Sequence, residues 1–323
     1  MKLLSNNRIF SERENFQCHA SSFLLLPDGG VLCVFFGGTR EGADDVCIWG
    51  CTRSGGIWSD PVRLTENDGQ PHWNPVLLRR RDGGITLFYK VGKPISDWRT
   101  ERKKCAFCST AQILGDLCRA EARELMPGDT GGGRGPVKNK AIYLSDGTLI
   151  APASTEKSEW QAFFDLSQDD GETWERTDSL SIGVHERGRG VIQPSVWESD
   201  DGVHALLRSS EGRLCRSDST DHGRRWRAPY STSLPNNNSG IDLDRMTDGT
   251  LILAYNPVSG NWGRRSPLSL ACSRDDGLTW TKALDLIAAD GEYSYPAIQC
   301  RGRHIFVSYT YNRRSIAFAE AEL

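Results

Sequence analysis

Short runs in which apolar residues predominate recur along this chain, and their length and alternation are typical of β-strands. Residues 205–208, 250–255 and 304–309 are such runs, rich in Leu, Ile and aromatic side chains. Asp-Gly pairs, which favour tight turns, stand at residues 146–147, 201–202 and 248–249. The pattern therefore predicts an all-β protein of short strands joined by tight turns.

One turn motif is repeated along the chain. The pattern Ser-x-Asp-x-Gly-x-x-Trp occurs three times and ends at Trp174, Trp226 and Trp280, which are 52 and 54 residues apart. A degenerate copy ends at Trp58, 116 residues before Trp174, a distance of two repeats. In such a turn the Asp accepts hydrogen bonds from backbone amides, the Gly adopts a positive φ and the Trp packs between neighbouring sheets.

The repeat length predicts the architecture. A unit of about 54 residues has room for a four-stranded sheet, and such sheets repeated radially form a β-propeller. The period divides the 323 residues about six times, and no linker interrupts the series. We therefore expect one domain, residues 1–323, that is an all-β, six-bladed β-propeller. Its C-terminal strand near residues 315–319 should pair with the N-terminus and close the ring.

One stretch departs from the repeat. A turn motif is due near residue 116, but residues 108–125 have a composition that favours helix. We interpret this stretch as the divergent edge of one blade.

Composition and charge narrow the function classes. Hydrophobic residues make up 38% of the chain, which is enough for a large core. The formal net charge is -3 and the longest basic runs are short, so nucleic acid is not an expected partner. The apolar runs are strand-length, far short of the ~20 residues of a membrane helix, so no membrane partner is expected. The N-terminus becomes polar at residues 5–7, before a secretory signal could form, which predicts a cytoplasmic protein.

The ten cysteines do not indicate disulfides or a metal. Several lie inside apolar runs, as Cys33 does, and we expect them to be buried free thiols. Cys105 and Cys108 have the spacing of a zinc-binding pair, but no second pair follows at a suitable distance. We therefore expect no metal and no cofactor.

The repeated turn motif at this spacing resembles the Asp-box of the sialidase superfamily of six-bladed propellers, and within it the BNR-repeat branch. The resemblance extends over nearly the whole chain. It implies the fold more than the function, because non-enzymatic propellers also carry Asp-boxes. The enzymes of the family hold a substrate carboxylate with three arginines, use an aspartate as acid and attack with a tyrosine that a glutamate activates.

Four positions of this chain match those functional residues. Asp45, five residues after Arg40, resembles the acid. Arg208 and Arg265 resemble the second and third arginines of the carboxylate clamp, and Tyr295 resembles the nucleophile.

Two positions depart from the family pattern. His19 stands where the first arginine belongs, and Gln193 stands where the activating glutamate belongs. A glutamine can hydrogen-bond a phenol but cannot accept its proton, and a phenol with a pKa of about 10 needs such help at neutral pH. The departure places ordinary sialidase chemistry in question.

Further polar side chains interrupt the predicted inner strands, which line the central funnel of a propeller. Donors, carboxylates and aromatic walls there suit a hydroxylated, anionic sugar. The candidate substrate-binding residues are Arg40, His72, Asn74, Lys90, Asn139, Lys140, Trp160, Gln193, Arg208, Asn238, Asp242, Asn256 and Arg265. The candidate catalytic residues are Asp45, Tyr295, His19, Glu41 and Glu156.

Three functions fit these residues. An exo-acting glycoside hydrolase would use Asp45 as acid, with Glu41 or Glu156 as second carboxylate, and release a terminal acidic sugar. A polysaccharide lyase would use Tyr295 or a histidine to abstract the proton next to a uronate carboxylate. A lectin would bind the sugar without turnover. Hydrolysis is our main expectation, and an acidic sugar or oligosaccharide is the expected partner.

Overall fold

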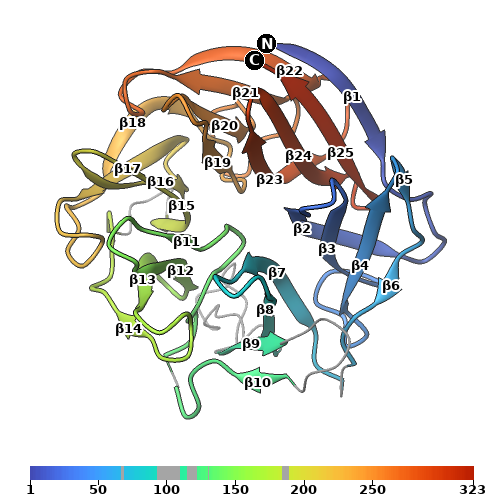
Figure 1. Cartoon of the computed structure of the whole chain (residues 1–323), viewed down its shortest axis with the longest axis horizontal. Helices are drawn as coiled ribbons and strands as arrows, with labels where there is room; N and C mark the ends of the chain where they lie inside the picture. The colour runs from blue at the N-terminus through green and yellow to red at the C-terminus, as the bar shows by residue number, and fades with distance from the viewer. Residues whose placement is uncertain (67–68, 93–109, 115–121, 130, 184–188) are drawn as a thin grey trace.

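The computed structural model describes residues 1–66, 69–92, 110–114, 122–129, 131–183 and 189–323. Within these ranges all helices are absent and the regular structure consists of β-strands, so nothing there could cross a membrane as a helix. The strands form six separate antiparallel sheets arranged around a ring (Figure 1). The prediction of an all-β propeller is confirmed.

Each sheet is one blade. The strands nearest the centre of the ring are β2, β7, β11, β15, β19 and β23 (Figure 1). The first blade contains β2 (Gln17–Leu25), β3 (Val31–Gly38), β4 (Cys47–Ser54), β5 (Ile57–Trp58) and β6 (Val62–Arg63). The second contains β7 (His72–Arg79), β8 (Ile85–Val91), β9 (Thr110–Leu114) and β10 (Arg123–Glu124). The third contains β11 (Ile142–Tyr143), β12 (Leu149–Glu156), β13 (Trp160–Ser167) and β14 (Glu175–Arg176).

The remaining blades follow in chain order. The fourth contains β15 (Val191–Ser199), β16 (Gly202–Ser209), β17 (Arg213–Ser219) and β18 (Tyr230–Pro235). The fifth contains β19 (Asp242–Arg245), β20 (Leu251–Tyr255), β21 (Leu268–Ser273) and β22 (Thr281–Ile287). The sixth contains β23 (Tyr293–Arg301), β24 (His304–Tyr311), β25 (Ser315–Glu322) and, from the other end of the chain, β1 (Lys2–Arg8).

The ring is closed by the two ends of the chain, as predicted. β1 pairs antiparallel with β25, so that Asn6 lies opposite Ala319 and Asn7 opposite Phe318. The termini are side by side at the rim (Figure 1). The sixth sheet therefore combines strands from both ends of the given sequence.

The three repeated turn motifs make the same hydrogen bonds in three successive blades. The Ser hydroxyl accepts from the Gly amide at 2.8 to 3.0 Å, and each Trp Nε1 donates to the carbonyl of that same Gly. The Gly φ values are 93°, 77° and 78°, a conformation that other residues rarely adopt. Trp174 packs edge-on against Phe88 of the preceding blade, and Trp226 stacks on Phe164 of the blade before it. The tryptophans are therefore equivalent, as predicted.

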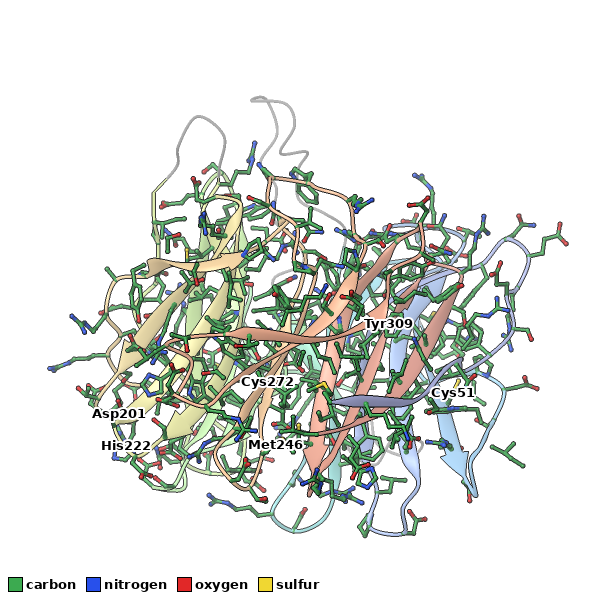
Figure 2. The ribbon with its side chains drawn as sticks, turned by 90° about the horizontal axis from the view of Figure 1, so that it is seen from above. Cys51, Asp201, His222, Met246, Cys272 and Tyr309 are labelled. Atoms are coloured by element: carbon green, nitrogen blue, oxygen red, sulfur yellow. The ribbon has the colours of Figure 1, made fainter. Side chains whose placement is uncertain are left out.

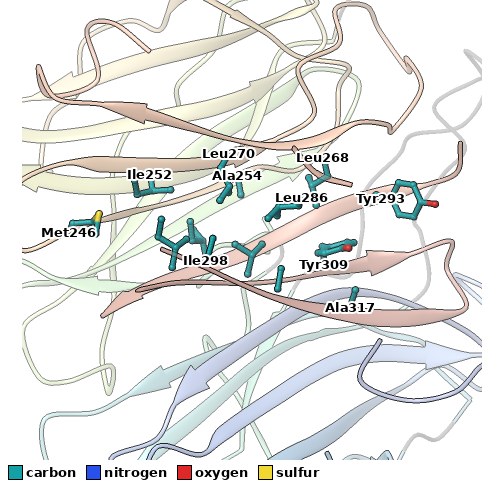
Figure 3. Close-up of a cluster of buried hydrophobic side chains, with 14 residues drawn as sticks. Met246, Ile252, Ala254, Leu268, Leu270, Leu286, Tyr293, Ile298, Tyr309 and Ala317 are labelled. Carbon is teal, nitrogen blue, oxygen red and sulfur yellow. The ribbon is translucent and has the colours of Figure 1, made fainter. Parts of the chain in front are cut away.

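The hydrophobic core lies between the blades. In one cluster Met246, Ile252 and Leu268 of the fifth blade pack against Ile298 and Tyr309 of the sixth (Figure 3). Five further clusters fill the other interfaces of the ring in the same way. A single blade has little core of its own, and burial of apolar side chains drives neighbouring blades together.

The described parts of the divergent stretch, residues 110–114 and 122–125, lie at the outer edge of the second blade. β9 pairs with β8, and β10 pairs with β9, although the sequence there favours helix. Sheet pairing has overridden local propensity. Residues 93–109, with Cys105 and Cys108, lie outside the described residues. The seven described cysteines are free thiols; five are buried, and Cys272 and Cys300 are half-buried.

Candidate functional site

The innermost strands of four blades carry a β-bulge near their beginning. The pairing register shifts once in β2, β7, β15 and β23. At each shift one residue has a positive φ: Ala20, Asn74, Gln193 and Tyr295, at 43° to 53°. A bulge breaks the alternation of a strand and re-aims one side chain. The fold thus presents one residue per bulge in a conformation that neighbouring groups must hold.

Proline marks three of these bulges in the sequence. Asn74, Gln193 and Tyr295 are each followed by proline, at Pro75, Pro194 and Pro296. A proline has no amide proton for the ladder, so within sheets it is confined to edges and bulges. These Xaa-Pro pairs were an available signal for the bulges that our sequence analysis did not use.

Arg208, on β16, joins two of the bulge residues. Its Nη1 donates to the Tyr295 hydroxyl at 2.7 Å and to Gln193 Oε1 at 3.0 Å. Its Nε donates to Asn238 Oδ1 at 2.8 Å. All four side chains are buried. The sequence-based matches Tyr295, Gln193 and Arg208 therefore meet at one point.

Aromatic rings surround the Arg208 guanidinium. Its central carbon lies 5.6 Å from the Trp160 ring, 5.7 Å from the Trp262 ring and 5.7 Å from the Tyr295 ring. Cations are attracted to aromatic faces at such distances. Trp160 was among the predicted residues, whereas Trp262 was not. Trp262 is 46% exposed and has φ 61°, unusual for a bulky residue.

A second group of charges lies on the other side of Tyr295. Arg265 lies 5.5 Å from the Tyr295 ring, and its Nη1 donates to Glu292 Oε1 at 2.6 Å. Glu292 also accepts from Arg313 Nε at 2.9 Å, and Arg313 is paired with Glu41. Burial would raise the pKa of Glu292, but the two arginines lower it overall. The result is an alternating chain of charges that ends at Glu41.

His19 packs against Tyr295 as a neutral ring. The ring centroids are 4.1 Å apart, and His19 Nδ1 shares a 2.8 Å hydrogen bond with the Thr310 hydroxyl. Burial, and then the positive charges led by Arg313 and Arg265, lower the pKa of His19 well below its usual value. A neutral imidazole therefore occupies the position that the family resemblance assigns to an arginine. Arg313, which sequence analysis missed, brings a third guanidinium to this region.

The candidate carboxylates differ in environment. Glu156, at the end of β12, is half-buried. Burial raises its pKa to about 7; the positive charge of Arg208 opposes this rise and the negative charge of Glu41 adds to it. Asp45 is exposed, and both its oxygens accept from Thr39 at 2.9 Å. Among the hydrogen bonds of the described residues, none joins a carboxylate to Tyr295, and Asp45 stays a prediction as the acid.

Several predicted substrate-binding side chains use their polar atoms within the protein instead. Lys140 Nζ donates to Asp242 and to the carbonyls of Leu243 and Ile298. Asp242 also accepts from Ser195 Oγ at 2.7 Å. These contacts tie the third, fourth, fifth and sixth blades together and lend no support to the expected sugar contacts of Lys140 and Asp242.

Four other predicted positions also form hydrogen bonds within the protein. Asn139 Nδ2 donates to the carbonyls of residues 193 and 194, and Asn256 Nδ2 to those of residues 267 and 293. His72 shares a hydrogen bond with Thr65, and Lys90 donates to a backbone carbonyl of residue 134. Carbonyls at irregular backbone need donors, which Asn139, Asn256 and Lys90 supply.

Three further predicted positions have distinct placements. Asn238 accepts from Arg208 and donates through Nδ2 to Asn261 Oδ1 at 2.7 Å, so it supports the arginine. Arg40 is exposed before β4, and Asn74 is half-buried at the bulge of β7. Arg40 and Asn74 remain predictions as substrate contacts.

In the described part of the chain, one group of side chains has potential metal ligands within reach of one another: Asp201, His204 and Asp276. His204 Nε2 lies 3.1 Å from a carboxylate oxygen of each aspartate, and its Nδ1 lies 2.7 Å from Asp218. Asp201 comes just after the end of β15, whereas Gln193 lies near the start of that strand. Figure 2 shows Asp201 toward the lower edge of the molecule, near His222. The group belongs to a contact between blades and not to the candidate site.

A sequence model of the BNR repeat-like domain matches residues 29–307, which is most of the chain. The chain belongs to the BNR repeat-like domain family. This assignment confirms the predicted sialidase-like superfamily. No curated protein matches this BNR repeat-like chain by sequence.

Solved structures resemble this BNR repeat-like protein in fold. A protein of unknown function from Dyadobacter fermentans superposes with a TM-score of 0.78 at 18% identity, covering 100% of this chain and 99% of that one. The NanB sialidase from Streptococcus pneumoniae gives 0.73 at 14% identity, covering 98% and 70%. The sialidase of Trypanosoma rangeli gives 0.69 at 13% identity, covering 98% and 58%. The chain thus spans only part of these two sialidases, and the likeness establishes the propeller fold.

Proposed function

We propose that this BNR repeat-like protein is an exo-acting glycoside hydrolase that releases a terminal acidic sugar from a glycan. The observation that carries the proposal is the meeting of Tyr295 with Arg208 and Arg265, the first hydrogen-bonded and the second over its ring. Guanidinium groups bind carboxylates through paired, charge-assisted hydrogen bonds. An oxygen nucleophile beside an anion clamp suits attack on a sugar that carries its own carboxylate.

The residues have the following roles in this proposal. Arg208 and Arg265 bind the sugar carboxylate. The Tyr295 oxygen forms a bond to the anomeric carbon while the bond to the leaving oxygen breaks, and Asp45 protonates that oxygen. Glu156 accepts the phenol proton, a role that Gln193 cannot perform. Water then displaces Tyr295 and completes hydrolysis.

Product analysis on a panel of sialosides and uronate-terminated oligosaccharides tests this function. We expect a free reducing acidic sugar and no ultraviolet absorbance of a new carbon–carbon double bond. An unsaturated product would replace hydrolysis by elimination. Tight binding of one panel member without turnover would make the protein a lectin.

Glu156 makes turnover depend on pH near neutrality. Because its pKa is about 7, its acid and base forms are both populated there, as a proton-transfer group requires. We expect Glu156→Gln to lower kcat by about 10²-fold or more and to remove the limb of the kcat profile near pH 7. Glu159→Gln is the matched control, because Glu159 is a half-buried glutamate three residues further along the chain, directly before β13.

The same carboxyl affects stability. Its pKa is raised above the unfolded value, so its contribution is fully present below about pH 4 and is lost as pH rises through 7. Thermal melting of Glu156→Gln should therefore depend less on pH over this interval than that of the wild type. An unchanged kcat profile in the variant would remove Glu156 from the mechanism.

Elimination is a second candidate, which one observation favours. The Tyr295 hydroxyl accepts a hydrogen bond from the Arg208 guanidinium, and Gln193, bonded to the same guanidinium, carries no charge. A lyase needs a base and a positive charge that neutralises the carboxylate of the substrate. It does not need a pair of catalytic carboxylates in the protein. In this reaction the Tyr295 oxygen would take the proton next to a uronate carboxylate held by Arg208. The double bond would form as the bond to the leaving oxygen breaks, and Tyr295 would pass the proton to that oxygen.

A further inference from the structure

Two adjacent residues of the third blade hold the bulges that present Tyr295 and Gln193. Lys138 Nζ donates to the carbonyl of Pro296, directly after Tyr295, and at 2.6 Å to the carbonyl of Ile241. Asn139 Nδ2 donates to the carbonyls of Gln193 and Pro194, at 3.0 and 2.9 Å. One dipeptide thus contacts the backbone of both bulges, which lie on different blades.

The dipeptide is itself fixed. Lys138 Nζ donates to Asn139 Oδ1 at 2.9 Å, so the two side chains form one connected unit, and both are buried. The three donors of the ammonium match three oxygen acceptors. Burial lowers the pKa of Lys138 to about 7, and the carboxylate of Asp242 opposes this fall.

The Lys138 ammonium also faces the Tyr295 ring. Its Nζ is 6.0 Å from the ring centroid. Gly240 separates them: a Cβ there would lie 3.1 Å from Lys138 Cε and 3.3 Å from Tyr295 Cγ. The tyrosine, the glycine and the lysine are therefore tightly packed. A replacement of Lys138 can shift Gly240 and, through it, the Tyr295 ring.

We propose that Lys138 and Asn139 are positioning residues, which hold the two bulges so that Tyr295 and Gln193 meet at Arg208. The kinetic part of this inference rests on the proposed function. Its structural part does not, because the Tyr295–Arg208 contact can be observed without turnover.

Lys138→Met tests the inference, with Lys140→Met as matched control. Methionine keeps the buried stem but removes the three donors. Lys140 is also a lysine with acceptors on the fifth and sixth blades, but it does not contact the carbonyls of residues 193, 194 or 296. Both variants should lose thermal stability, so stability alone does not separate them.

Two measurements separate the variants. Crystal structures show whether the bond from Arg208 to Tyr295 persists, and steady-state kinetics shows whether kcat or KM changes. In Lys138→Met we expect the 2.7 Å bond from Arg208 to Tyr295 to be lost and kcat to fall about 10²-fold, as expected for a misplacement of about 1 Å. KM should change little, because Arg208 and Arg265 remain. In Lys140→Met the bond and kcat should persist.

Each other outcome has a defined meaning. An intact Tyr295–Arg208 bond in Lys138→Met, or an equal fall of kcat in both variants, overturns the inference. If the wild type turns over no substrate, the proposed function fails, and the crystal comparison alone decides this inference. If Lys138→Met does not fold, Asn139→Ser replaces it, and the 3.0 Å bond from Arg208 to Gln193 should then be lost; its retention overturns the inference.

Discussion

Tyr295→Phe should abolish turnover and leave binding of the acidic sugar nearly intact. The variant removes one oxygen and keeps the ring, whose centroid lies 4.1 Å from that of His19, so the packing around the ring is retained. Arg208 keeps its bonds to Gln193 and Asn238 and remains available to the ligand. Loss of a nucleophile, or of the base in elimination, costs at least about 10³-fold in kcat. Single-turnover kinetics and calorimetric binding on the same sample measure the two effects.

Tyr293→Phe is the matched control for this experiment. Tyr293 is a buried tyrosine two residues away, on the same strand, but its hydroxyl donates to the carbonyl of Asp290 and its ring packs on Tyr311. It should retain kcat despite a loss of stability. Full activity of Tyr295→Phe on the true substrate would refute the tyrosine mechanism, and a carboxylate pair or a histidine base would take its place.

The fold could be predicted from local signals. Three turn motifs at nearly constant spacing fix the length of a blade, and each motif makes its own hydrogen bonds within eight residues, so sequence alone specifies it. Closure of the ring by β1 and β25 follows from the repeat, because an open propeller would leave an unpaired edge. The composition near β9 favours helix, yet the repeat length predicted a blade edge there, and β9 and β10 do pair at the edge of the second blade.

The site could be predicted only in part, because its polar residues have two different tasks. Tyr295, Gln193 and Arg208 were found through the family pattern and do meet. Asn139 and Asp242 look the same in sequence, as polar side chains in predicted inner strands, yet they satisfy backbone groups and partner side chains of other blades. Sequence spacing does not reveal which carbonyls a bulge leaves unpaired, so it cannot separate these tasks.

Other members of the site depend on contacts between distant segments. Arg313 comes from the turn between β24 and β25, and reaches Glu292 and Glu41, the latter 272 positions away in the chain. Lys138 contacts a carbonyl 158 positions away. Neither residue lies in a motif, and their neighbours are brought to them only when the ring closes.

Arg208→Lys should weaken binding of an acidic sugar by about 10- to 100-fold, since a charge-assisted hydrogen bond contributes about 1.5 to 3 kcal/mol. Lysine keeps the charge but has no planar guanidinium. In Arg208 two guanidinium nitrogens donate to Tyr295, Gln193 and Asn238. The neutral amide analogue of the same sugar should lose much less, because it offers no carboxylate to the clamp. Calorimetric titration with both ligands measures the difference.

Arg216→Lys provides the control for this last prediction. Arg216 is a buried arginine of the same blade. It bonds to Asp218, to His204 and to the carbonyl of Asp276, and not to Tyr295 or Gln193. Its replacement should lower thermal stability and leave the affinity for the acidic sugar unchanged. Equal losses for the acidic and neutral ligands in Arg208→Lys would show that the arginine only supports the pocket. A loss confined to the acidic ligand would instead mean that the hydrogen bonds from Arg208 to Tyr295 and Gln193 prepare the guanidinium for a carboxylate, so that nucleophile and clamp are one assembly.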